Sequence, residues 1–88
     1  MEYKNKERQL KEEGFLRTYV WTDKPNMRYA DHTHHAISAH IILKGEMELI
    51  VEGKKHILRE GDRFDVPANA VHSACMGPEG CSYLVGEK

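Results

Sequence analysis

Cysteine is scarce in this chain, and there is no framework of disulfides to organise it. The 88 residues contain two cysteines, Cys75 and Cys81, too few for such a framework. We expect both to be free thiols, although their spacing would also let a disulfide bridge the two arms of a hairpin. The sequence must therefore be stabilised by its core and by whatever it binds.

Long apolar runs and an excess of charge of one sign are also absent. No apolar stretch approaches the ~20 residues of a membrane-spanning helix, and the charged start at residues 1–4 is unlike a signal peptide. The formal net charge of −1 gives no electrostatic reason to expect a nucleic-acid partner. We therefore expect a cytoplasmic protein that binds neither membranes nor nucleic acid.

The length of the chain allows one domain. We place this domain at residues 15–88, after an N-terminal arm or short helix at residues 1–14 that is rich in polar helix formers and ends near Gly14. A domain this small buries only about 60% of the surface that its unfolded chain exposes, so a bound metal or a second subunit would add needed stability. The segment 15–21 is unusually rich in large apolar residues for a peripheral strand, which predicts a homodimer.

Beyond residue 14 the pattern indicates an all-β fold. Apolar and polar residues alternate over 46–52, as in a strand with one buried face, and Glu52-Gly53 predicts a hairpin turn. Another turn is expected at residues 77–80, between two final strands at 71–76 and 81–85. Further strands are expected at 15–22, 38–43, 56–59 and around 64–66. Many short strands with turns every 8–12 residues favour a barrel or a sandwich. The side chains expected in its interior are Met47, Leu49, Val51, Ile57, Phe64, Val66 and Ala74.

Histidine is the residue type that points to chemistry. Four of the six histidines fall between positions 32 and 40, and His72 lies far off in sequence. On a strand, the spacing of His32 and His34 places both imidazoles on one face, with their backbones about 6.6–7 Å apart, so that both rings can bind one ion. On a helix the same spacing would point them to nearly opposite sides. His35 is expected to face outward, and His56 lies in a charged hairpin.

Two motifs in order resemble those of the cupin family. His32-Thr-His34, followed by Ser38 and Gly45, is similar to the first cupin motif, in which His-x-His precedes a Glu and a Gly. Gly61, Pro67, Asn69 and His72 have the spacing of the second motif.

The resemblance covers about residues 28–85 and implies a double-sheet jelly-roll barrel. It also implies a divalent transition metal held by His32, His34 and His72. A barrel of this kind that has lost its metal is the alternative.

The departures from the family pattern bear on the metal. Ser38 stands where the family has a carboxylate, Asn69 replaces a glycine, and Met76 replaces an asparagine. Three neutral imidazoles would leave the ion's full charge uncompensated, which favours anions in its open positions and zinc, nickel, iron or copper over manganese. His40, two residues beyond Ser38, is a possible fourth ligand or an acid–base group deeper in the barrel.

Two function classes follow from these expectations. The first is a non-catalytic metal-binding module that binds a small, anionic organic ligand in a pocket lined by Ser38, Met47, Phe64 and Tyr83. The second is a metal-dependent enzyme, resembling the three-histidine cupin dioxygenases. An isomerase of phosphorylated sugars is a weaker alternative, since no cluster of Arg and Lys is expected to face inward. The sequence leaves both classes open and names no catalytic residue.

Overall fold

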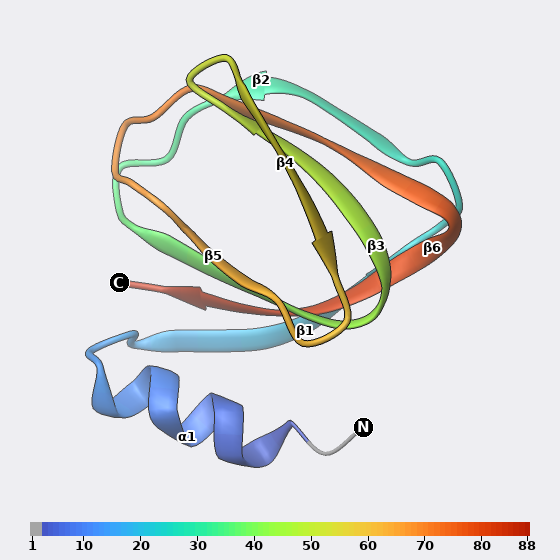
Figure 1. Cartoon of the computed structure of the whole chain (residues 1–88). Helices are drawn as coiled ribbons and strands as arrows, with labels where there is room; N and C mark the ends of the chain where they lie inside the picture. Colours follow the sequence, from blue (N-terminus) through green and yellow to red (C-terminus); the bar gives the residue numbers. More distant parts are fainter. Residues whose placement is uncertain (1–2) are drawn as a thin grey trace.

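The computed structural model describes residues 3–88, which form one short helix and six strands. Figure 1 shows the strands curving around a common interior, with the helix lying outside against one wall. The elements are α1 (Lys4–Glu12), β1 (Arg17–Asp23), β2 (Arg28–His32), β3 (Ser38–Val51), β4 (Lys54–Arg59), β5 (Arg63–Val66) and β6 (His72–Glu87). Within residues 3–88, no helix has the length and apolar character needed to cross a membrane.

Two long antiparallel strands, β3 and β6, form the centre of the sheet. They pair along most of their length, from Ser38 opposite Glu87 to Val51 opposite His72. The shorter strands β1 and β2 add to β6, while β4 and β5 add to β3. All these pairs are antiparallel, as expected for a jelly-roll barrel.

The turn expected at residues 77–80 is wrong, because this segment lies inside the continuous strand β6. Likewise, the two strands expected at 38–43 and 47–51 are halves of β3. The register between β3 and β6 shifts around Gly45, whose φ of +85° and close approach to the Gly80 carbonyl oxygen leave no room for a Cβ. Glycine therefore bends these strands and does not end them.

The strand expected at 15–22 begins at Arg17, two residues later. Phe15 lies before it and packs in a hydrophobic core outside the barrel, between the sheet and α1. Helix α1 packs on the outer face of the sheet, where Leu10 and Phe15 are 0% and 2% exposed. Their partners on that face include Ala39, Ile41 and Leu84. The Arg63 guanidinium also donates two hydrogen bonds to the Glu13 carboxylate, which lowers the pKa of Glu13 to about 2.

Most of the apolar side chains expected in the interior of the barrel lie there, and one does not. Met47, Leu49, Val51 and Val66 are buried there. Ile57 was expected inside but is 38% exposed, because Leu58 pairs with Met47 across the sheet and takes the inward position. The two-residue turn at Glu52-Gly53 has positive φ at both positions, as the hairpin requires.

Replacing Leu10 by Ala should lower the free energy of unfolding by about 2–5 kcal/mol, because it removes a fully buried side chain from the outer core. Leu16→Ala is the matched control: Leu16 is 88% exposed, so its loss should change stability by no more than about 0.5 kcal/mol. Urea denaturation followed by circular dichroism measures both. Equal effects would mean that α1 does not pack on the barrel.

Candidate metal centre

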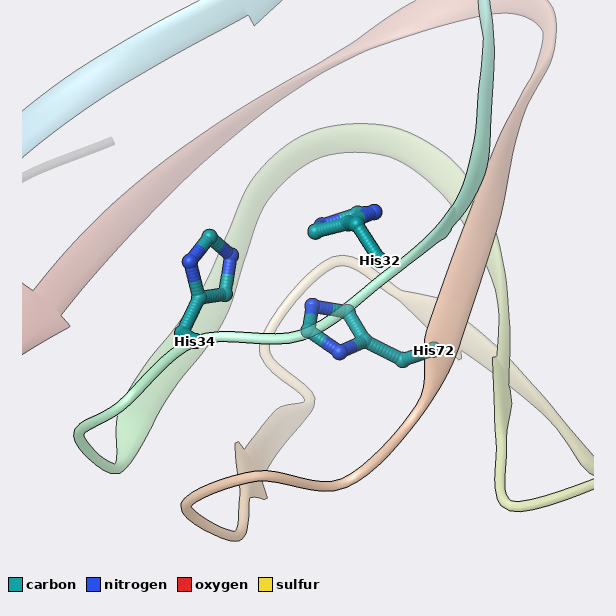
Figure 2. Close-up of side chains that lie close together, drawn as sticks. All are labelled: His32, His34 and His72. Carbon is teal, nitrogen blue, oxygen red and sulfur yellow. The ribbon is translucent and has the colours of Figure 1, made fainter.

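Three histidines from separate parts of the chain meet at one place. His32 is the last residue of β2, His34 lies in the segment after it, and His72 is the first residue of β6, where it pairs with His32. Figure 2 shows the three rings grouped around a common space. Their ligand atoms all lie within 4.8 Å of one another, and the ring centroids are 4.1–5.1 Å apart. This grouping can hold a metal ion.

Backbone carbonyls orient two of the three rings. The Nδ1 atom of His32 lies 2.7 Å from the Ala30 carbonyl oxygen, and that of His72 lies 3.0 Å from the Ala70 carbonyl oxygen. In the tautomer in which Nδ1–H donates to each carbonyl, Nε2 keeps its lone pair for a metal. Burial lowers the pKa of His72, which favours the neutral form that a metal requires.

The loops that carry the histidines are tied to each other. The backbone N–H of Asn69 donates to the His34 carbonyl oxygen at 2.7 Å. Asn69 has a φ of +66°, so asparagine adopts here the left-handed conformation for which the family motif has a glycine. His35 is exposed and lies outside the histidine group, as does His56, whose ring packs on Phe64.

A cavity of about 660 Å³ adjoins the three histidines. Ser38, Met47 and Tyr83 line it, but Phe64 does not, because its ring packs on His56 at a centroid distance of 4.4 Å. Its remaining lining is mostly aromatic and apolar, with one basic and one acidic residue: Arg17, Tyr19, Val20, Trp21, Tyr29, His40, Leu49, Ala74, Met76, Val85 and Glu87. Strand β1 borders the cavity and contributes Arg17, which is the one Arg or Lys in its lining among residues 3–88.

A buried carboxylate that the sequence analysis missed organises one wall of this cavity. Asp23 is 7% exposed and accepts hydrogen bonds from the hydroxyls of Tyr29 at 2.6 Å and Tyr83 at 2.7 Å. It also accepts one from the Trp21 indole at 3.0 Å. The Tyr83 hydroxyl is thus buried and committed as a donor, and burial together with the Asp23 charge raises its pKa. Asp23 precedes Lys-Pro, and the sequence around it predicts only a turn.

Ser38 and His40 lie on the inner face of β3 and also line the cavity. The Ser38 Oγ and the His40 Nδ1 are closed off from solvent and have no hydrogen-bond partner among residues 3–88. Loss of solvent around the ring lowers the pKa of His40 to about 4, and His72 adds to the effect. His40 is not one of the residues whose ligand atoms meet within 4.8 Å. Its place is beside the three-histidine group.

The comparisons with known proteins agree with this geometry. The family model of the cupin domain matches residues 19–86. A DMSP lyase, DddQ from Ruegeria pomeroyi, superposes with a TM-score of 0.75 at 28% identity, over 81% of this chain and 36% of that one. An RmlC-like cupin from Shewanella frigidimarina gives a TM-score of 0.73 at 23% identity, over 80% and 62%.

KdgF from a Halomonas species superposes with a TM-score of 0.68 at 22% identity, over 81% of this chain and 67% of that one. The chain thus spans between about one third and two thirds of the length of these three structures. None of the curated proteins matches the chain significantly. On the match of the family model to most of its length, this chain belongs to the cupin family.

Proposed function

We propose that the protein binds one divalent transition-metal ion through His32, His34 and His72, and that a small anionic organic molecule binds at the ion's open positions. The observation that supports this most directly is the meeting of three imidazoles beside a large cavity. Neutral imidazoles leave the charge of a divalent ion uncompensated, which favours an anionic group as a further ligand. The apolar walls suit the carbon skeleton of such a ligand.

The donor set also bears on which metal binds. Three nitrogen ligands with no carboxylate beside them favour zinc, nickel, iron or copper over manganese, which prefers oxygen. The position that would carry a carboxylate is Ser38, whose hydroxyl is neutral.

A metal-dependent enzyme, such as a dioxygenase, is the second candidate. One observation favours it: the His40 Nδ1 lines the same cavity, lacks a partner among the described residues and stays unprotonated at neutral pH. With a pKa of about 4 this nitrogen is a weak base at neutral pH, but it can accept a hydrogen bond from a bound substrate. Among the similar structures, DddQ is named a lyase, so the fold carries an enzyme in at least one relative.

The neighbouring residues His34 and His35 offer a matched test of the metal site. His34→Ala should remove stoichiometric metal from the purified protein, whereas His35→Ala should retain it, because His35 is exposed and lies outside the histidine group. Elemental analysis of untagged protein measures the content and identifies the metal. Metal at about 100 times its Kd should stabilise the wild type by about 2.7 kcal/mol and should not stabilise His34→Ala. Loss of metal from His35→Ala alone would place the site elsewhere.

A second test restores the missing carboxylate. Ser38→Glu should tighten Mn²⁺ binding about tenfold or more and weaken azide binding to the metal-loaded protein, because an anionic oxygen reduces the charge of the centre. Ser38→Gln has nearly the same volume without the charge and should do neither. Titration calorimetry measures both ligands. Equal behaviour of the two variants would mean that a side chain at position 38 does not reach the metal.

We further propose that the protein is a homodimer. Strand β1 lies at one end of the strand order, and Val20 and Trp21 on it are 39% and 49% exposed. An edge strand with large exposed apolar residues is the kind of surface that a second subunit covers. Since Val20 and Trp21 also line the cavity, a subunit packed on β1 would lie close to the bound ligand.

Light scattering of the wild type at micromolar concentration should give twice the 10.2 kDa mass of one chain. Val20→Lys should shift it to the monomer, because a charge would be buried in the interface. Ile57→Lys is the control, since Ile57 on β4 has nearly the same exposure, 38%. A monomeric wild type would exclude the dimer, and dissociation by Ile57→Lys alone would move the interface to β4.

A further inference from the structure

Two polar atoms on the inner face of β3 lack partners among the residues that the structure describes. They are the Ser38 Oγ and the His40 Nδ1. Ser38 is 4% exposed, so bulk water does not satisfy its hydroxyl. A buried polar group without a partner is unfavourable, and folded proteins satisfy nearly all such groups with protein, water or a ligand. The position of these two atoms favours a bound ligand as their partner.

Both side chains line the cavity that contains the three metal-site histidines. The His40 ring centroid lies 6.1 Å from that of Tyr83, and His72 and His34 are near enough to depress the pKa of His40. His40 thus lines the same cavity as the three histidines and Tyr83. A small molecule bound to the metal would extend past it.

The hydrogen-bonding roles of the pair follow from their surroundings. The His40 Nδ1 has no partner among the described residues, and the tautomer with its proton on Nε2 presents a lone pair there. The Ser38 hydroxyl can donate or accept. The nearby Tyr83 hydroxyl, in contrast, already donates to Asp23. A carboxylate has no hydrogen to offer the His40 nitrogen, whereas a hydroxyl group offers both a donor and an acceptor.

We propose that Ser38 and His40 form a hydroxyl subsite, so that the ligand of this protein is a small hydroxycarboxylic acid. The carboxylate would bind at the metal, the hydroxyl would donate to the His40 Nδ1, and the Ser38 hydroxyl would donate to the hydroxyl oxygen. This inference rests on the proposed function, because it assumes that a carboxylate binds at the metal.

Matched pairs of acids test the subsite by titration calorimetry on the zinc-loaded full chain. Lactate is compared with propionate, and 3-hydroxybutyrate with butyrate, so that each pair differs by one hydroxyl at a different distance from the carboxylate. In the wild type, the hydroxy acid of at least one pair should bind about tenfold more tightly than its partner. A 2-hydroxy acid such as lactate can also chelate zinc through its hydroxyl, so the change of this ratio in variants of Ser38 and His40 reports the subsite, and the affinity for propionate reports the metal.

Three variants test which side chains cause the preference for the hydroxy acid. His40→Phe keeps a ring without the lone pair and should reduce the ratio to about one, with propionate affinity unchanged. His40→Gln, which retains an acceptor, should restore part of it, and Ser38→Ala should lower it. Tyr83→Phe tests whether the Asp23 wall carries the ratio instead, and Ser82→Ala, whose hydroxyl pairs with that of Thr22 outside the cavity lining, is the control that should keep the wild-type ratio.

The possible failures are distinguishable. Equal affinities within both pairs in the wild type overturn the subsite alone. Absence of binding by any of the four acids overturns the proposed anion site and the subsite with it. Loss of zinc from His40→Phe, measured by elemental analysis, would make His40 a fourth metal ligand and overturn the subsite. A ratio that persists in His40→Phe overturns the subsite, and its loss in Tyr83→Phe alone would move the hydroxyl contact to the Asp23 wall.

Discussion

The pairing of β3 with β6 is the constraint on which the rest of the structure depends. These two strands run antiparallel to each other from Ser38 and Glu87 at one end to Val51 and His72 at the other, and every other strand adds to one of them. Their inner faces supply most of the cavity wall. The β3–β6 ladder fixes which residues of these strands face inward. The register between β2 and β6 then places His72 opposite His32 at the end of β2.

The same ladder separates two cores. Along β3, Ser38, His40 and Ile42 face the interior, while Ala39 and Ile41 face the helix. The period of two in a strand makes this division unavoidable, since consecutive side chains point to opposite faces. The outer core with α1 covers one wall of the barrel. Because α1 covers the outer face of this wall, its inner face can carry polar groups such as Ser38 and His40, which line the cavity.

Charge in the cavity is arranged in separate regions. The histidine group can hold a cation, and behind the cavity lining the buried Asp23 carboxylate is stabilised by hydrogen bonds from two phenols and an indole. Those bonds link β1, β2 and β6. Ser38 and His40 are neutral groups of the cavity lining with unused hydrogen-bonding capacity. An arrangement of this kind suits a ligand with one anionic end and a neutral polar group further along.

The sequence by itself determined the all-β class, the inward positions of most of β3, the Glu52-Gly53 hairpin and the three histidines that meet. Short-range rules, namely alternation and turn chemistry, govern the strand and hairpin features, whereas the meeting of the three histidines follows from the resemblance to two cupin motifs. Tertiary structure decided the rest. Gly45 bends a strand that the sequence divides in two, because a bulge and a turn use the same residue type. Phe15 faces the helix and Ile57 faces solvent, because their orientation depends on register with a distant strand. Asp23 accepts several buried hydrogen bonds only because the fold brings Tyr29 and Tyr83 next to it on other strands. No local sequence pattern predicts those contacts.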